Sequence, residues 1–242
     1  MSASRAFRDS QYASQDSADP ARPRHELTPI EGVLEPDARL IMAHDPRDPR
    51  CEKIRALRTE LLLRRESPDR ADIVALLSPC AGEGRSLLAA ELAIAFAQTG
   101  RPTLLVDADL RRPQQHLLFR TDNRQGLSQA IETGVNPYLH AVHGLPRMSV
   151  LTAGAVPSNP LELLSSSGFA SMVEDWRDNF EFVVMDTAPV MHFSDGLAVA
   201  NVVGRVLTLS RAQHTSYKDM QDMLRRLAAT RSQILGAVIS HF

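Results

Sequence analysis

The sequence predicts an α/β fold with an open, mostly parallel β-sheet flanked by helices. Short apolar runs rich in β-branched residues alternate with helical segments along most of the chain. The runs are apolar throughout, which is typical of strands that are buried on both faces. Alternation of this kind favours parallel strands joined through helices, which then cover both faces of the sheet.

The elements follow one another from residue 51 onward. Residues 51–65 carry apolar side chains at helical spacing, and DIVALL at 72–77 predicts the first strand. An alanine-rich helix over 86–100 comes next, with Gly100 at its C-cap. Beyond it we expect strands at 102–109, 147–154, 180–189, 205–210 and 233–240, and helices at 126–134, 159–180 (one or two), 194–204 and 216–230.

The first 48 residues differ in composition from the rest of the chain. They are rich in Ser, Asp, Arg and Pro, and large apolar side chains are scarce among them. We therefore expect a disordered tail over residues 1–48 and one folded domain over residues 49–242. A short apolar patch at 39–44 is the part of the tail that could dock on this domain.

Bulk properties exclude several classes of protein. The formal net charge of the 242 residues is -2, so no basic field favours nucleic acid. Cys51 and Cys80 are the only cysteines, which fits a reducing compartment better than a disulfide framework. No apolar run approaches the roughly 20 residues of a membrane span, and the first residues do not resemble a secretory signal. We expect a cytoplasmic protein that meets a membrane only through a partner.

A glycine-rich turn joins the first strand to its helix. Within SPCAGEGRS, Gly82 and Gly84 would let backbone N–H groups face a phosphate at a helix N-terminus. The strict phosphate-loop pattern G-x-x-x-x-G-K-[ST] is broken twice, by Pro79 and by Arg85. Taken alone, the stretch therefore favours a nucleotide site and a simple tight turn about equally.

Three acids shift that balance toward a nucleotide site. Asp107 and Asp109 end one apolar strand, and Asp186 ends another. The carboxyl ends of parallel strands are where such sheets bind ligands, and acids buried there need a cation or donors. Three strand-end acids and a glycine loop together predict a Mg²⁺-nucleotide site.

With these motifs the sequence resembles the bacterial tyrosine kinases, cytoplasmic P-loop ATPases that accompany membrane polysaccharide co-polymerases. The resemblance covers about residues 44–240 and implies a P-loop NTPase fold of the partition-ATPase type. AGEGRS resembles the family's PGEGKS, LLVDADLRRP matches its strand followed by D-x-D-x-R, and EFVVMDTAPV resembles its DYVIIDTPPV. Residues 153–166, AGAVPSNPLELLSS, resemble a further family segment. Glu52, Arg55 and Arg58 match the family's E-x-x-R-x-x-R oligomerisation motif.

The resemblance implies ATP and Mg²⁺ as cofactors and, as in full members of the family, tyrosine autophosphorylation as the activity. It also implies a homo-oligomer and a role in capsule or exopolysaccharide polymerisation and export, with a membrane co-polymerase as partner at the inner membrane. Carried over by position, Ser86, Asp107 and Asp186 organise the metal, and Asp107 or Asp109 receives the tyrosine proton, with Arg85 on the phosphates. The residues expected to bind nucleotide are Gly82, Glu83, Gly84, Arg85, Ser86 and Leu87. The oligomer contact competes with a plain solvated helix face.

The sequence also departs from the family. Arg85 replaces the phosphate lysine, and arginine is longer, planar and harder to place beneath the β- and γ-phosphates. The family's C-terminal tyrosine cluster has no counterpart among Tyr12, Tyr138 and Tyr217, and Ser240 stands where relatives often carry asparagine. Two interpretations of the sequence therefore stay open. The chain is a kinase, or it is a regulatory module that binds nucleotide and transfers phosphate poorly. A third alternative is a partition or septum-site ATPase. Those proteins carry an additional lysine early in the loop, where this chain has Pro79 and Cys80.

Overall fold

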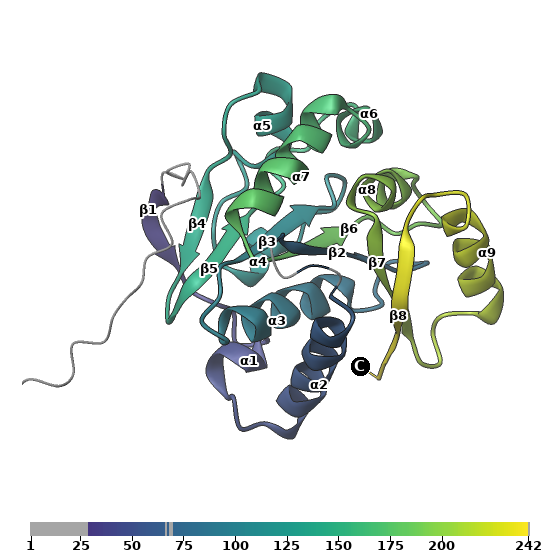
Figure 1. The fold of residues 1–242 in the computed structure, drawn as a ribbon, viewed down its shortest axis with the longest axis horizontal. Coiled ribbons are helices and arrows are strands. Elements are labelled where there is room, and N and C mark those ends of the chain that lie inside the picture. The colour runs from purple at the N-terminus through teal and green to yellow at the C-terminus, as the bar shows by residue number, and fades with distance from the viewer. Residues whose placement is uncertain (1–28, 66, 68–69, 242) are drawn as a thin grey trace, which may run out of the picture.

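A computed structural model describes residues 29–65, 67 and 70–241 of the chain. These residues form one eight-stranded sheet (Figure 1), and all neighbouring strands run parallel except β4 and β5. The strands, in their order across the sheet, are β1 (Pro29–Leu34), β4 (Leu139–Val142), β5 (Leu145–Leu151), β3 (Thr103–Ala108), β6 (Phe182–Thr187), β2 (Asp72–Leu77), β7 (Arg205–Arg211) and β8 (Gln233–Ser240).

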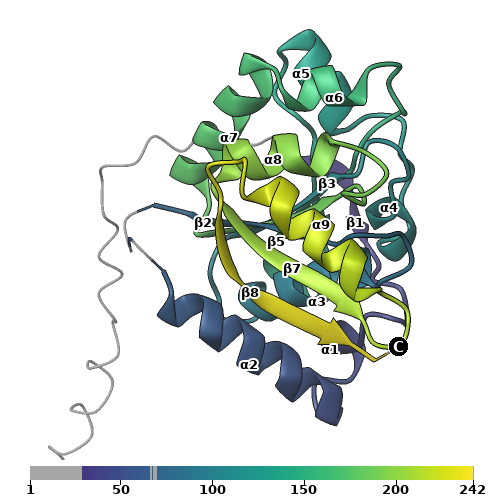
Figure 2. The same ribbon diagram turned by 90° about the vertical axis from the view of Figure 1, so that its right-hand side faces the viewer.

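Helices cover both faces of this sheet. One face carries α1 (Ile41–His44), α2 (Pro49–Leu63), α3 (Arg85–Ala97) and α4 (Gln115–Leu118). The other carries α5 (Leu127–Thr133), α6 (Pro160–Leu164), α7 (Ser167–Asn179), α8 (Asp195–Val203) and α9 (Tyr217–Leu227). Figures 1 and 2 show the two helical layers on opposite sides of the strands. The α/β fold expected from the sequence is confirmed.

The two faces are filled by alternate residues of the same strands. In β2, Val74 and Leu76 pack toward α3, whereas Ile73, Ala75 and Leu77 pack toward the opposite layer. Successive side chains of a strand point to opposite faces, so an all-apolar run serves two cores at once. α3 is the most deeply buried helix of its layer, with eleven of its thirteen residues buried. This accounts for its run of alanines, which lets it pack closely on the sheet.

The chain before residue 49 differs from the expected tail. Residues 1–28 lie outside the described part, but β1 and α1 occupy residues that we expected to be disordered. Leu40 and Met42, from the apolar patch at 39–44, are fully buried in the core around α3. The carboxylate of Glu91 on α3 accepts hydrogen bonds from the backbone N–H groups of Ile41 and Met42, at 2.7 and 2.9 Å. The folded chain therefore begins before residue 49, because this patch gains both apolar burial and hydrogen bonds.

Candidate nucleotide and metal site

The candidate site lies at the carboxyl edge of the central strands. The loop of residues 78–84 leaves β2, and the acids Asp107 and Asp109 lie at and just beyond the end of β3. Asp186 lies near the end of β6, which runs between β2 and β3 in the sheet. The sheet thus brings the glycine loop and all three acids to one edge, as the sequence predicted.

The glycines give the loop its turn. Gly82 and Gly84 have φ angles of 79° and 89°, in the left-handed region that side chains with a Cβ rarely adopt. A Cβ on Gly82 would meet nothing within 4 Å, so the requirement there is conformational and not one of space. Gly84 is the N-cap of α3 and lacks a side chain that could cap the helix. The first N–H groups of α3 are therefore left to a ligand or water, as in an anion site at a helix N-terminus.

Contacts from the neighbouring strands fix the loop in place. The Glu83 side chain is buried, and its carboxylate accepts hydrogen bonds from Cys80 N at 2.9 Å and Thr215 Oγ1 at 2.5 Å. Ser240 Oγ donates to the carbonyl of Glu83 at 3.0 Å, and Arg211 Nη1 donates to that of Gly82 at 3.1 Å. Glu83, expected among the nucleotide ligands, therefore points into the protein. Its side chain holds the loop and leaves only its backbone to face a phosphate.

Arg85 reaches across the strand ends instead of lying free in solvent. Its guanidinium is 7% exposed. Nη1 donates to Ser78 Oγ at 2.5 Å and Nε to Asp186 Oδ1 at 3.2 Å, while Nη2 lies 3.5 Å from Asp109 Oδ2. Three strand ends, those of β2, β3 and β6, are thus joined through one cation. The arginine occupies the space between the acids and neutralises part of their charge.

The acids Asp107 and Asp186 face each other across two paired strands and are fully buried. Asp107 accepts backbone N–H bonds from Asp109, Gln114 and Gln115 at 2.9–3.2 Å. Burial and then the adjacent Asp186 charge raise the pKa of Asp107 well above its usual range. Burial also raises the pKa of Asp186, although the Arg85 charge and a hydrogen bond from the Ser86 side chain act in the opposite direction.

Gln115 is a residue of this site that the sequence analysis missed. Its Nε2 donates to Asp186 Oδ2 and to the carbonyl of Ser86, both at 3.0 Å. Its backbone N–H goes to Asp107, so this one residue contacts both acids and the loop. Its Oε1 is buried and has no partner among the described residues. No glycine or charge marked Gln115 in the sequence. Only its position, eight residues after Asp107, could have pointed to it.

Arg111 closes the far side of the site. Its Nε donates to both carboxylate oxygens of Asp195, at 3.1 and 3.0 Å, and its guanidinium stacks on the Phe193 ring at 4.2 Å. Asp195 is fully buried at the start of α8. Ser194 is the N-cap of α8, and its side chain makes no capping hydrogen bond, whereas Asp195 holds the loop after β3 against α8 through Arg111.

The donor set fits a magnesium ion bound together with phosphates. Ser86 offers a hydroxyl, Asp107 and Asp186 offer carboxylates, and the free Oε1 of Gln115 could accept from a metal-bound water. Within the described ranges, no group of three or more His, Cys, Asp or Glu side chains is arranged to hold a metal by itself. Magnesium suits such a partial set, since it keeps waters and phosphate oxygens as its other ligands.

Comparison with known proteins places this chain in a family. A scan against models of known protein families finds no match. The chain is 33% identical over 205 residues to the tyrosine-protein kinase YwqD of Bacillus subtilis (strain 168), a match that covers 83% of this chain and 85% of that protein. The chain belongs to the bacterial tyrosine-protein kinases. It is also 29% identical over 203 residues to the putative tyrosine-protein kinase CapB of Staphylococcus aureus, with coverages of 83% and 88%.

Solved structures of bacterial tyrosine kinases have the same fold. The chimerical protein CapA2B2 superposes with a TM-score of 0.79 at 30% identity, over 88% of this chain and 94% of that chain. The kinase domain of the Escherichia coli tyrosine kinase ETK superposes with a TM-score of 0.77 at 30% identity, over 84% and 79%. The sequence match to etk of Escherichia coli (strain K12) covers only 27% of that longer protein. A cell division ATPase MinD of Pyrococcus furiosus, at 21% identity and a TM-score of 0.59, shares the fold alone.

The kinase's expected oligomer residues make contacts within their own chain. Arg55 on α2 pairs with Glu52 and also donates to the carbonyl of Pro46, at 2.6 Å. Arg58 donates to the carbonyl of Ala95 on α3, at 2.8 Å. Glu52 keeps a largely exposed side chain, 72%, and Arg55 is 26% exposed. The helix face is thus open at Glu52, and its role between copies stays a prediction. No described helix is long and apolar enough to span a membrane.

Proposed function

We propose that the chain is an ATP- and Mg²⁺-dependent protein-tyrosine kinase acting in capsule or exopolysaccharide polymerisation and export, with phosphoryl transfer attenuated by Arg85. The observation that carries the proposal is the meeting of Arg85, Asp109 and Asp186 beneath a preformed glycine loop. Membership of the bacterial tyrosine-protein kinases supports the activity. A membrane polysaccharide co-polymerase as partner, assembly into a homo-oligomer and a cytoplasmic location at the inner membrane are parts of the same proposal.

The proposed roles follow from what each residue contacts. The backbone from Gly82 to Leu87 would face the phosphates, and Ser86, Asp107 and Asp186 would hold Mg²⁺ and its waters. ATP with its metal supplies the phosphoryl group and neutralises charge on it. Asp109 is favoured over Asp107 as the base, because the Asp107 carboxylate already accepts hydrogen bonds from three backbone N–H groups. Asp109 also accepts from Arg111 N and Arg112 N, both through Oδ1, which leaves Oδ2 toward Arg85.

Arg85 is the reason for expecting slow transfer. Its guanidinium takes Asp186 Oδ1 and lies near Asp109 Oδ2, the positions that a metal-water cluster and a tyrosine proton would use. Binding of nucleotide therefore requires this side chain to move, or to share its carboxylates. Small displacements of reacting groups lower rates steeply, by as much as about 100-fold for 1 Å. Arg85 is thus expected to lower the transfer rate more than the affinity for nucleotide.

A second candidate function is a regulatory module that binds nucleotide, oligomerises and docks on the co-polymerase without efficient transfer. The three partners of Arg85 favour it, because they stabilise a state in which the acids are engaged by the chain itself. The two candidates differ in turnover and agree on binding.

The test measures nucleotide binding and phosphate transfer separately. Binding of ATP with Mg²⁺ is followed by calorimetry, and transfer from ³²P-labelled ATP is followed on the chain and on an added random copolymer of glutamate and tyrosine. The kinase proposal expects binding and slow transfer, and faster transfer for Arg85→Lys. Binding without transfer in either protein favours the regulatory module, and absence of binding overturns both.

A further inference from the structure

The connection from β3 to α5 presents one arginine whose side chain has no partner among the described residues. Residues 109–126, which form this connection, carry four arginines: Arg111, Arg112, Arg120 and Arg124. Three of them bind carboxylates, in the pairs Arg111–Asp195, Arg120–Asp37 and Arg124–Asp122. Arg112 is exposed, and its guanidinium makes no hydrogen bond or ion pair within the described ranges. Its charge is therefore available to another molecule.

The acids of the site hold the backbone around Arg112. Within residues 111–115, the first two backbone N–H groups donate to Asp109 Oδ1, at 3.2 and 3.0 Å. The last two donate to Asp107 Oδ2, at 3.0 and 2.9 Å. Pro113, between them, has no N–H and a fixed φ angle. Every backbone donor of this turn is thus engaged, so the exposed Arg112 side chain projects from a backbone that the candidate base itself holds in place.

Arg112 lies close to the candidate base. Its backbone N is 3.0 Å from Asp109 Oδ1. The N–Cα bond adds about 1.5 Å, so the Arg112 Cα lies within about 4.5 Å of that oxygen. Consecutive Cα atoms of a polypeptide are only about 3.8 Å apart. An acceptor that places a tyrosine hydroxyl at Asp109 therefore brings the residues beside that tyrosine within reach of the Arg112 side chain.

The charges of the site determine what an exposed arginine there can do. Asp109, Asp186 and the phosphates of ATP are negative, and Arg85 neutralises only part of this charge. A carboxylate beside the acceptor tyrosine would be repelled by them unless a cation lay next to it. A guanidinium is suited to this task, because it binds a carboxylate through two parallel N–H bonds. All five N–H donors of the Arg112 side chain are free for such a contact.

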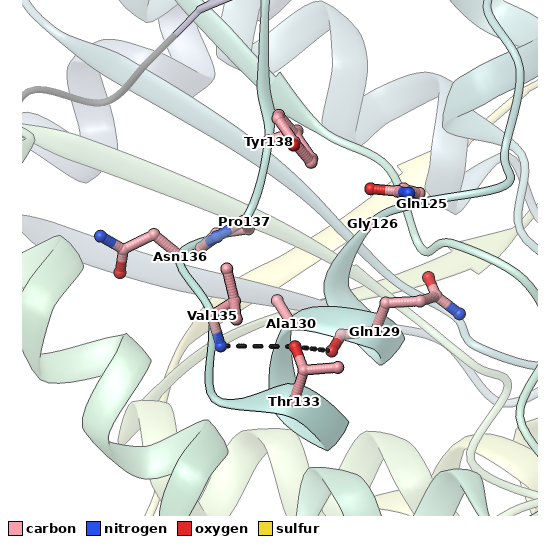
Figure 3. A pocket seen from close by; sticks show the side chains of 9 residues that line it. All are labelled: Gln125, Gly126, Gln129, Ala130, Thr133, Val135, Asn136, Pro137 and Tyr138. Carbon is pink, nitrogen blue, oxygen red and sulfur yellow. Dashed lines mark hydrogen bonds between the residues drawn. The ribbon is translucent and has the colours of Figure 1, made fainter.

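A small hollow beside α5 offers no comparable partner for a charged group (Figure 3). Its volume is about 50 Å³, and the nine residues that line it carry no charged side chain. One water needs about 10–15 Å³ of such space, so the hollow holds a few waters and not a long side chain. Figure 3 also shows the amides of Gln129 and Asn136 pointing away from each other. The hollow therefore does not explain recognition of an acidic acceptor.

We propose that Arg112 selects acceptor polypeptides that carry an acidic side chain beside the tyrosine to be phosphorylated. The inference rests on the proposed kinase function and names the class of its acceptor. The Arg112 guanidinium pairs with the carboxylate of the acceptor while the tyrosine hydroxyl lies at Asp109. The neighbouring Arg111 does not take this role, because Asp195 and the Phe193 ring already hold its guanidinium.

The test uses two peptides that differ only beside a single tyrosine. Glutamates flank the tyrosine in one peptide, and glutamines flank it in the other. Transfer from ³²P-labelled ATP gives kcat/KM for each peptide, with the natural chain and in an Arg85→Lys background. We expect the glutamate peptide to be preferred about fivefold, near the upper limit for an exposed ion pair, and Arg112→Gln to lose this preference. The matched control Arg124→Gln, at an exposed arginine of the same connection, should keep it.

A charge reversal separates recognition from a structural effect. Arg112→Glu should disfavour the glutamate peptide and favour a third peptide with lysines beside the tyrosine. If Arg112→Gln keeps the natural preference, or loses affinity for ATP with Mg²⁺ in calorimetry, Arg112 does not select the acceptor, and the inference is overturned while the kinase function stands. A natural chain without any preference between the first two peptides overturns it as well. If no peptide is labelled in either background, the proposed function fails, and this inference fails with it.

Discussion

The helix α3 carries two buried charges, and their partners differ in kind. Arg85 at its first residue is 7% exposed, and Glu91 in its second turn is 4% exposed. Arg85 bonds to side chains at the ends of three strands. Glu91 bonds only to backbone N–H groups, those of Ile41 and Met42. Burying either charged group costs free energy, so each needs hydrogen-bond or ionic partners at its own position.

Because of this difference, a ligand can compete for the partners of Arg85 but not for those of Glu91. Mg²⁺ or a phosphate can compete for the partners of Arg85, because the carboxylates bind cations and the guanidinium binds anions. Nothing but the chain itself can supply the N–H groups that Glu91 binds. The first residue of α3 is therefore suited to function, whereas its second turn anchors the segment around α1. Each prediction below tests this division.

The largest effect is expected for Asp186→Asn, at the Arg85 end. We expect phosphoryl transfer to fall by about 100- to 1000-fold, because a charge beside the metal and phosphates is removed. The free energy of unfolding should change by no more than about 1 kcal/mol, since relief of a buried charge offsets the weakened hydrogen bonds. Transfer assays and urea unfolding check the two parts. If Asp186→Asn unfolded readily and still transferred phosphate, the Arg85 end of α3 would have a structural role as well.

Glu91→Ala should show the opposite pattern. Two buried backbone N–H groups lose their acceptor, so unfolding should become easier by about 2 kcal/mol or more. Affinity for nucleotide with Mg²⁺ should stay unchanged, because Glu91 does not contact the loop. Urea unfolding and calorimetry measure the two quantities, and Glu60→Ala on exposed α2 is the matched control. A loss of nucleotide affinity without a loss of stability would contradict the division.

Arg85→Lys should raise the rate of transfer by about tenfold, equivalent to about 1.4 kcal/mol of barrier. Lysine is a compact cation that can leave Asp109 and Asp186 while it still binds phosphate. Single-turnover assays with bound ATP isolate this step from binding. A rate equal to that of the natural chain would show that Arg85 does not limit transfer.

The smallest effect concerns pH. Asp107 and Glu91 both have pKa values raised by burial, so the folded chain holds their protons more tightly than the unfolded chain. Their contributions to stability are therefore full at low pH and are lost as the pH rises from the ordinary pKa, about 3.8 for Asp107 and about 4.5 for Glu91, through the raised pKa of each group. Unfolding in urea, compared between the natural chain and Asp107→Asn, isolates the Asp107 part. Saturating Mg²⁺ and ATP should remove that part and leave the Glu91 part. If the natural chain instead gained stability relative to Asp107→Asn as the pH rises, the assigned direction of the Asp107 pKa shift would be wrong.

The sequence could predict the strands and the loop because these follow local rules. All-apolar runs such as 72–77 identify central strands, and Gly82 with Gly84 identifies a turn into a helix. The acids at strand ends were predictable because parallel strands share one carboxyl edge. The short elements β1, β4, α1 and α4 lacked a long enough pattern to be recognised.

Contacts between segments that lie far apart in the sequence could not be predicted from local sequence patterns. The bonds from Glu83 to Thr215, from Glu91 to the chain at 41–42 and from Gln115 to Asp186 join residues that lie 49 to 132 positions apart. The apolar patch at 39–44 marked Leu40 and Met42 as residues that could dock on the domain, but no pattern predicted the short elements β1 and α1 in this part of the chain. The position of Arg85 in the sequence was clear, but its partners among three strands required the structure.

The contacts that hold the phosphate loop have a thermodynamic consequence. Fixing the backbone of one residue costs about 1–2 kcal/mol in conformational entropy. Because Thr215, Ser240 and Arg211 already hold Glu83 and Gly82, that entropy is lost when the chain folds and not when nucleotide arrives. Binding should then proceed with little loop ordering, and association should be limited by diffusion and by displacement of Arg85. Displacement of Arg85 is then a rearrangement that the capture of nucleotide and the transfer step both still require.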